Sequence, residues 1–339
     1  SAASDVYKRQ AYWRRPFELK MADKLWQGAD LIFDLDGDHL PGVTDRDFPG
    51  MLEVIQEQAW SLWNDYLEPE FGFSEDHLQV TFSGHRGFHL HYRDPKLFHL
   101  DSEARRELVS HIRGEGVDVQ GGLARFHDMS ARGWTQRIRQ GMDAMIDTLR
   151  SIQRGDEGSG AELTRLESAL KSLQDREGNT SQRSASAIKR LAELMMHDGR
   201  VQRLKEGKFE LLGNYQALFL NLLKADASVV LGSAGETDEV VTIDVRRQIR
   251  WPTSLHGKSG MRVSEFPLHR LDPDASNAYN PLHEAFVLGM DDSIEIEWVV
   301  DEAVAQFGDQ RIESNVGERF SIHESGATFL VLKGWAQLV

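Results

Sequence analysis

The chain has 339 residues, of which 40% are hydrophobic and 27% are charged, and its formal net charge is −15. This length is sufficient for one large core or two smaller ones, so we expect one main domain that carries an insertion. No apolar run approaches the roughly 20 residues that span a bilayer, and we expect no membrane contact. The acidic balance excludes a surface coated with basic patches, so any contact with nucleic acid must be local.

The sequence contains no cysteine, which excludes disulfides and zinc sites made of thiolates, and we expect no structural zinc. No positively charged, apolar, cleavable leader is recognisable, so we expect a cytoplasmic protein. Residues 1–10 show no periodicity and no initiating Met. We expect them to be a foreign or truncated start ahead of Ala11.

Alternating apolar and polar residues over positions 30–36 predict a strand that Gly37 ends. One face of this strand carries three apolar side chains, and the other carries Asp34 and Asp36. The segment Thr44 to Asp47 is a capping box, and the apolar residues after it recur at helical spacing. The apolar residues of the predicted helix are Phe48, Leu52, Ile55, Ala59, Leu62 and Tyr66.

Two further alternating segments, residues 78–83 and 88–92, flank the turn Gly84-His85-Arg86-Gly87 and predict a β-hairpin. Their apolar residues form the core face. The polar residues Ser83, His89 and His91 are then left on the opposite face.

Helical periodicity dominates from about Ser102 to Leu223, with Gly- and Ser-rich breaks at residues 154–161 and 178–186. Strand patterns return later in the chain. We therefore predict an α/β (α+β mixed) fold with a mixed sheet and an inserted helical subdomain. The expected later strands are residues 239–245, a strand near residues 261–263, and residues 293–300 and 328–332. The expected domains are 11–100 and 226–339, the two halves of the α/β domain, and 101–225, the helical subdomain.

Asp34 and Asp36 lie two residues apart on one predicted strand, so their carboxylates leave the same face about 6.6 Å apart. Such a pair can hold one or two divalent ions for in-line displacement at phosphorus. Oxygen ligands favour hard cations such as Mg²⁺ or Mn²⁺. The structural alternative is a turn, because Asp-Gly-Asp is also common loop chemistry.

A second cluster runs from Ser83 to His89. Its two glycines let the backbone approach a ligand, and Ser83, Arg86 and His89 offer hydrogen-bond donors to a phosphate. The alternative is an ordinary hairpin turn with a surface arginine and a structural histidine.

A third cluster, residues 246–262, contains five Arg or Lys among seventeen residues. This local electropositive segment suits a triphosphate or a template backbone, and a solvated basic face is its alternative. Upstream, Asp238 and Asp244 would share a strand face about 20 Å apart, so only one could join a metal site. Spacing alone leaves both open.

Taken in order, Phe33-Asp34-Leu35-Asp36, Ser83-Gly84-x-Arg86-Gly87-x-His89 and Arg250-x-Pro252-x-Ser254-Leu255-His256-Gly257 resemble the archaeal and eukaryotic-type DNA primase small (catalytic) subunit. The resemblance extends from Trp26 to the C-terminus, where residues 327–334 are similar to the family's closing strand. It implies a two-metal site for Mg²⁺ or Mn²⁺. The implied catalytic metal ligands are Asp34, Asp36 and Asp238, and the implied nucleotide-binding residues are Ser83, Arg86, His89, Arg250 and His256.

The same resemblance implies template-directed synthesis of short primers for DNA replication. The implied substrates are nucleoside triphosphates and a single-stranded DNA template, and the implied partner is a large regulatory primase subunit in a heterodimer. The chain departs from the family in two respects. Family members usually have a longer N-terminal sequence ahead of the first aspartate motif, including basic residues that help form the active site. Many also carry a small zinc-binding knob made with cysteines.

Three alternatives stay open at this point. Residues 32–37 also resemble the nucleophile strand of haloacid-dehalogenase-like phosphatases, with Asp34 as nucleophile and Asp36 as acid. That family expects Thr where Asp38 stands, and it leaves the second and third clusters unexplained. The others are a non-catalytic binding module of the same fold and a repair polymerase of the same superfamily.

Overall fold

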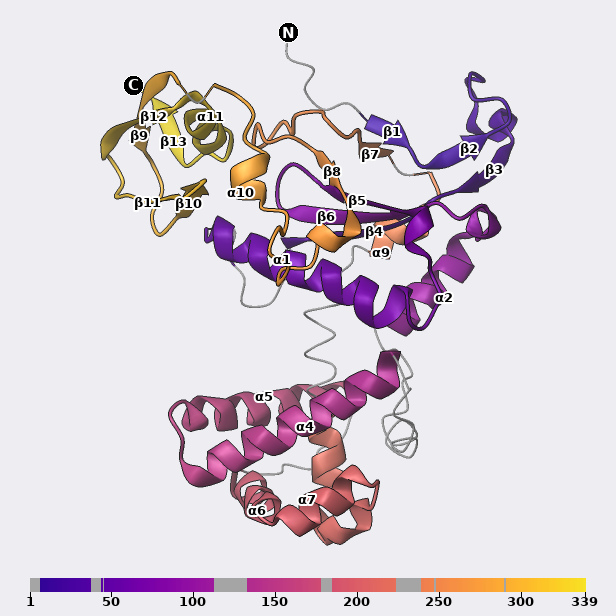
Figure 1. Ribbon diagram of the computed structural model, residues 1–339, viewed down its shortest axis with the longest axis vertical. Helices are drawn as coiled ribbons and strands as arrows, with labels where there is room; N and C mark the ends of the chain where they lie inside the picture. The colour runs from indigo at the N-terminus through magenta and orange to yellow at the C-terminus, as the bar shows by residue number, and fades with distance from the viewer. Residues whose placement is uncertain are drawn as a thin grey trace. The chain divides into compact units, whose positions relative to one another are not determined.

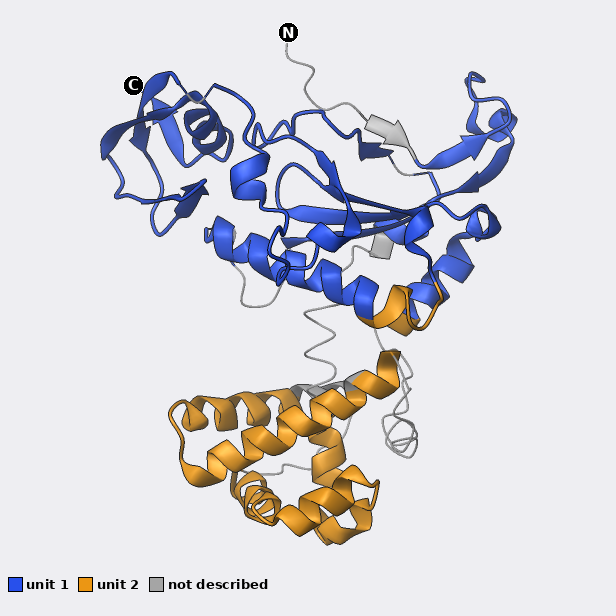
Figure 2. Ribbon diagram, viewed as in Figure 1, with its two compact units in different colours: residues 1–64, 73–110, 234–339 blue, residues 65–72, 111–233 orange. Residues whose placement is uncertain are grey.

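The structure is a computed structural model, and it describes residues 7–37, 44, 46–112, 133–177, 185–223, 239–246, 248–289 and 291–339. Two compact units are present (Figure 2): a sheet unit of residues 1–64, 73–110 and 234–339, and a helical unit of residues 65–72 and 111–233. The combination of sheets and helices confirms the predicted α/β (α+β mixed) class.

The centre of the sheet unit is a four-stranded sheet in the order β4-β6-β5-β8 (Figure 1). All of its strand pairs are antiparallel. The first strand and the hairpin predicted from alternation are both confirmed. The strands are β4 (Leu31–Asp36), β5 (Leu78–Phe82), β6 (Gly87–Tyr92) and β8 (Ser264–Phe266).

One face of this sheet is covered by α1 (Phe48–Leu62), which packs against β4 and β6 (Figure 1). Its predicted apolar residues are buried, and a π-helical turn, Trp63–Leu67, follows it. The helix begins later than the expected capping box, because the side chain of Asp47, not Thr44, accepts the hydrogen bond from Gly50 N (3.3 Å).

The other face of β4 is covered by α9 (Glu239–Ile243), where Ile32 packs with Val241 and Ile249. The predicted strand over residues 239–245 is therefore wrong, and a short helix replaces it. The Thr242 hydroxyl donates to Ile32 O at 2.8 Å, which ties the helix to the strand. A short β-branched run has no periodicity that distinguishes a strand from a buried helix.

Arg105 of α2 (Ser102–Ile112) connects β4 and α9 in the interior of the sheet unit. Its side chain is fully buried. The guanidinium donates to Leu100 O at 2.9 Å, and to Asp30 O and Ala29 O, both at 2.8 Å; Thr242 O lies at 3.5 Å. One side chain therefore fixes the start of β4 and the end of α9 together.

The N-terminal strands extend this unit. β1 (Tyr7–Arg9) pairs with β7 (Gln248–Arg250), and β2 (Ala11–Trp13) pairs with β3 (Trp26–Ala29). Residues 7–10 were expected to belong to a foreign start. In the structure, however, β1 pairs with β7, and the backbone carbonyl of the buried Gln10 accepts a hydrogen bond from Asp30 N (3.1 Å).

The C-terminal part forms a three-stranded sheet in the order β12-β9-β13, a hairpin and the helix α11 (Glu324–Leu332). The strand predicted over 293–300 is confirmed as β9. The strand predicted over 328–332 is wrong, because His323 caps a helix there: its Nδ1 accepts from Gly326 N at 3.0 Å. The strands are β9 (Ser293–Trp298), β10 (Val304–Phe307), β11 (Gln310–Glu313), β12 (Arg319–His323) and β13 (Ala336–Leu338).

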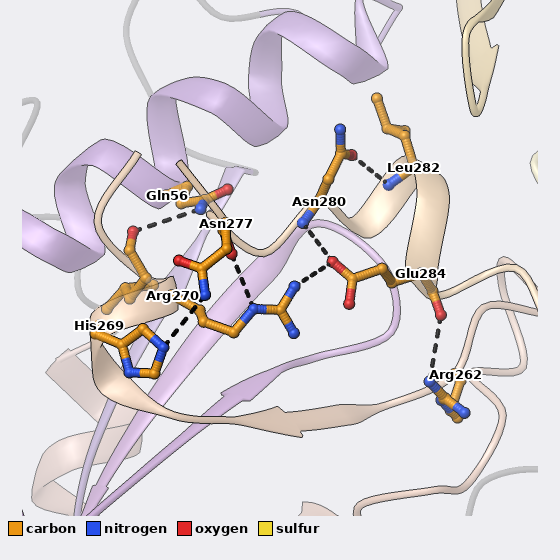
Figure 3. A network of polar contacts seen from close by, with 9 residues as sticks. Gln56, Arg262, His269, Arg270, Asn277, Asn280, Leu282 and Glu284 are labelled. Carbon is orange, nitrogen blue, oxygen red and sulfur yellow. Dashed lines mark hydrogen bonds and ion pairs between the residues drawn. The ribbon is translucent and has the colours of Figure 1, made fainter. Parts of the chain in front are cut away.

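A polar network holds the segment after β8, which includes η7 (Leu268–Arg270) and α10 (Pro281–Glu284), beside α1 (Figure 3). Arg270 donates to Asn277 O (2.9 Å) and pairs with Glu284 (2.7 Å). Glu284 also accepts from Asn280 N at 3.0 Å. The network closes a loop that packs over Gln56.

The helical unit is built around one apolar cluster whose residues come from four helices, the 3₁₀ segment η6 and the helical residues 216–223 that follow it. The expected break after Arg154 is present between α4 and α5; residues 178–184, the core of the second expected break, lie outside the described residues. No described helix combines the length and apolarity needed to cross a bilayer. The described elements of the helical unit include α4 (Gly133–Arg154), α5 (Ser159–Glu177), α6 (Ala185–Met195), α7 (Asp198–Lys205) and η6 (Phe209–Tyr215).

The sheet unit also contains the 3₁₀ turns η1 (Met21–Lys24), η4 (Glu75–His77) and η5 (Pro95–Leu97).

Candidate active site

The predicted carboxylate pair lies beside two of the predicted nucleotide-binding residues. Strand register places Asp34 opposite His89 and Asp36 opposite Gly87. The Asp34 carboxylate lies 3.1 Å from His89 Nε2, and the Asp36 carboxylate lies 3.2 Å from Arg86 Nε. The side chain of Asp34 is 15% exposed and that of Asp36 is 40% exposed, so solvent and small ions reach both.

The glycines of the β5–β6 turn permit this arrangement through close backbone packing. A Cβ on Gly87 would lie 2.5 Å from Leu35 O, so only glycine lets the turn meet β4. Gly84 has φ +82°, and a Cβ there would lie 3.0 Å from the His256 Cβ. The glycines predicted to admit a ligand thus also bring β4, the turn and the His256 loop together.

Ser83 organises the same turn. Its Oγ accepts from Gly87 N at 3.1 Å and from His85 N at 3.4 Å. A serine hydroxyl has one proton to donate as well as two acceptor lone pairs, so these bonds leave its donor capacity for another group.

His256 lies in a tight loop after β7 and reaches the turn from the other side. It is buried, and its Nδ1 accepts from Lys258 N at 3.1 Å, which leaves Nε2 as the protonated nitrogen of the neutral ring. The ring stacks on His85 with centroids 4.9 Å apart. His85 occupies an unspecified position of the predicted motif and was given no role, because such a position carries no spacing signal.

His85 is 6% exposed, and the pKa of its imidazole is lowered to about 2. Burial is the largest cause, and the neighbouring basic groups of Lys333, His256, Lys258 and Arg250 add to it. The segment of residues 250–258 and the end of α11 therefore bring basic side chains together around this buried imidazole. Arg250, at the end of β7, is one of these neighbours, and its role in nucleotide binding stays a prediction.

The third predicted carboxylate, Asp238, immediately precedes α9 and lies outside the described residues. Its alternative, Asp244, lies near the opposite end of β4: Gln10 Nε2 donates to Asp244 O (2.6 Å), and Gln10 O accepts from Asp30 N. Asp30 precedes Asp34 by four residues, or about 13 Å along a strand. The structure thus separates Asp244 from the carboxylate pair.

The described residues contain no group of three or more His, Asp or Glu side chains placed to hold a metal ion. The Asp34 and Asp36 carboxylates nevertheless fit Mg²⁺ or Mn²⁺, since they supply hard oxygen donors from one strand face within reach of solvent. With Asp238 undescribed, the metal site stays a prediction.

A cavity of about 620 Å³ lies on the α1 side of the sheet unit, between α1 and the loop that Figure 3 shows. Its lining includes Glu53, Gln56 and Asn280. None of the predicted site residues lines this cavity.

Paired carboxylates on an antiparallel sheet, flanked by Arg and His groups from a glycine turn and a basic loop, define a candidate nucleotidyl-transfer domain. The model of the family "DNA primase small subunit" matches residues 33–267. The chain is 32% identical to the DNA primase small subunit PriS of Methanothrix thermoacetophila, over 98% of this chain and 83% of that one. It is also 32% identical to PriS of Halorubrum lacusprofundi, over 99% and 82%.

The chain therefore belongs to the DNA primase small subunit family, as its motifs indicated. The matched residues include the Ser83–His89 cluster and the Arg250–Gly257 segment. Both were unexplained by a dehalogenase-like phosphatase, so family membership overturns that alternative. The family supports a polymerase-type nucleotidyltransferase.

Proposed function

We propose that this chain is the catalytic subunit of a DNA primase and makes short primers on single-stranded DNA by two-metal nucleotidyl transfer. The supporting observation is the meeting of the β4 carboxylates with Arg86 and His89 of the neighbouring turn, in a chain of this family.

In this proposal Asp34, Asp36 and Asp238 hold Mg²⁺ or Mn²⁺. The bound ions would neutralise charge at the α-phosphate as the primer 3′-hydroxyl attacks and pyrophosphate leaves. His89 and Arg86 lie directly beside the carboxylates, so a triphosphate that they bind also lies beside the metal ligands.

Ser83, Arg250 and His256 complete the proposed nucleotide site. Ser83 holds the turn in shape and keeps a hydroxyl proton to donate, while the basic loop supplies charge. Positioning a triphosphate by such groups provides much of the rate enhancement in phosphoryl chemistry. Arg250 suits this role because its guanidinium is charged at all physiological pH values and presents several donors.

The relatives are named as small subunits, and we propose a large regulatory subunit as the partner in a heterodimer. That partner would supply template contacts, because a chain with net charge −15 offers only local attraction to DNA.

The test is incorporation of labelled nucleotides on a single-stranded DNA template by the wild-type chain and the variants Asp34→Ala and Asp36→Ala. Each substitution is expected to lower incorporation by at least about a hundredfold without loss of circular dichroism signal. The matched control is Asp301→Ala, an exposed carboxylate outside the site, which should retain activity. Full activity in either site variant would rule out the assignment.

A further inference from the structure

The C-terminal helix brings a lysine toward the His85–His256 pair. Lys333 directly follows α11, and its Nζ lies 5.5 Å from the centroid of the Phe48 ring and 5.0 Å from that of Trp335. The Phe48 ring in turn lies 6.2 Å from the His85 ring. Lys333 lies outside residues 33–267, which the family model matches.

Packing fixes the position of this helix. A Cβ built on Gly260, four residues after His256, would lie 3.1 Å from Thr328 Cγ2 and 3.6 Å from Leu332 Cδ1. At the other side of α11, the Phe329 ring meets the Phe48 ring at 4.9 Å. The helix is therefore held against both the His256 loop and the start of α1.

The electrostatics of His85 point to an anion. Four basic groups lower its pKa, with Lys333 the first after burial, and no carboxylate is among the causes. Its Nε2 is buried without a hydrogen-bond partner among the described residues. Concentrated positive charge in a chain of net charge −15, around a buried ring nitrogen that lacks a partner, favours binding of a negatively charged ligand.

We propose that Lys333, together with His85 Nε2 and Lys258, binds the terminal phosphates of the incoming nucleoside triphosphate. This inference rests on the proposed function, because the triphosphate is the substrate of that reaction. The lysine ammonium suits the role because it is a compact charge with three donors on a flexible stem. Nε2 of neutral His85 can carry a proton and donate it to a phosphate oxygen.

The experiment compares Lys333→Met, which keeps an apolar stem over the Phe48 and Trp335 rings, with Lys333→Arg, which keeps the charge. Lys96→Met, an exposed lysine of the same unit, is the matched control. The probes are ATP and AMP in equilibrium binding with Mg²⁺, and primer synthesis over a range of ATP concentrations.

Lys333→Met is expected to weaken ATP binding and raise the KM for ATP about tenfold, with kcat within about twofold and AMP binding unchanged. Lys333→Arg and Lys96→Met should stay within about threefold of wild type. Equal loss of ATP and AMP binding in Lys333→Met, or no loss of ATP binding, would overturn the inference.

A second measurement keeps the test sound if Lys333→Met unfolds more easily. Inorganic triphosphate should raise the melting temperature of the wild type and of Lys333→Arg more than that of Lys333→Met; equal rises contradict the inference. Failure of the wild type itself to bind ATP or to incorporate nucleotides would instead contradict the proposed function.

Discussion

Replacing the buried Arg105 tests how the two elements around the site are held together. Arg105→Leu removes the donors to three close carbonyl oxygens, those of Leu100, Asp30 and Ala29, and the longer contact to Thr242 O. Each hydrogen bond from a charged group contributes about 1.5–3 kcal/mol, and the carbonyl oxygens that lose these donors stay buried. Because new apolar packing offsets part of the loss, we expect the free energy of unfolding to fall by about 3–5 kcal/mol.

The assay is urea unfolding followed by circular dichroism, in which the two compact units are expected to give separate transitions. Only the transition of the sheet unit should shift. Arg105→Lys, which keeps the charge but cannot reach all of the carbonyls at once, should lose less than Arg105→Leu. A loss below about 1 kcal/mol in Arg105→Leu would refute the view that this side chain anchors β4 and α9.

Two further predictions concern the turn. In Gly87→Ala the new Cβ would meet Leu35 O at 2.5 Å, so we expect about 2–4 kcal/mol lower stability and weaker primer synthesis; an unchanged melting temperature would contradict the close approach. His85→Phe tests the pKa of His85, which is lowered to about 2 in the folded chain from 6.5. The unfolded chain gains the proton as pH falls below about 6.5, so this residue makes the folded state less stable in acid, by up to about 1.4 kcal/mol per pH unit. Between pH 7.5 and 5.5 the wild type should therefore lose about 1.4 kcal/mol more stability in urea titrations than His85→Phe does, and equal losses would contradict the assignment.

Strict alternation made the strands that carry the candidate site predictable. The period of two along residues 30–36 and 88–92 places Asp34 and His89 on the same face, because successive side chains of a strand point to opposite sides. What alternation could not supply was register. The distance of 3.1 Å between Asp34 and His89 depends on which residues of the two strands are paired.

The two wrong strands have a common cause. Residues 239–245 and 328–332 are short segments rich in β-branched or apolar residues, and such segments fit a buried strand or a buried helix equally well. A local signal existed only for the second: Gly334, at φ +70°, directly follows Lys333 and favours the end of a helix. The first helix forms because its apolar side packs on Ile32.

The roles of His85, Arg105 and Lys333 required three dimensions. No spacing rule links Lys333 to a turn near residue 85, since the two meet only when α11 packs against the start of α1. The basic composition of residues 246–262 did predict positive charge. It gave no sign that the helix after β12 adds to it.

The most direct test of the metal site is to measure Mn²⁺ binding by electron paramagnetic resonance. The proteins compared are the wild-type chain and the variants Asp238→Asn and Asp244→Asn. We expect Asp238→Asn to weaken Mn²⁺ binding at least about tenfold and Asp244→Asn to leave it unchanged. The opposite result, loss in Asp244→Asn with wild-type affinity in Asp238→Asn, would contradict the proposed set of metal ligands.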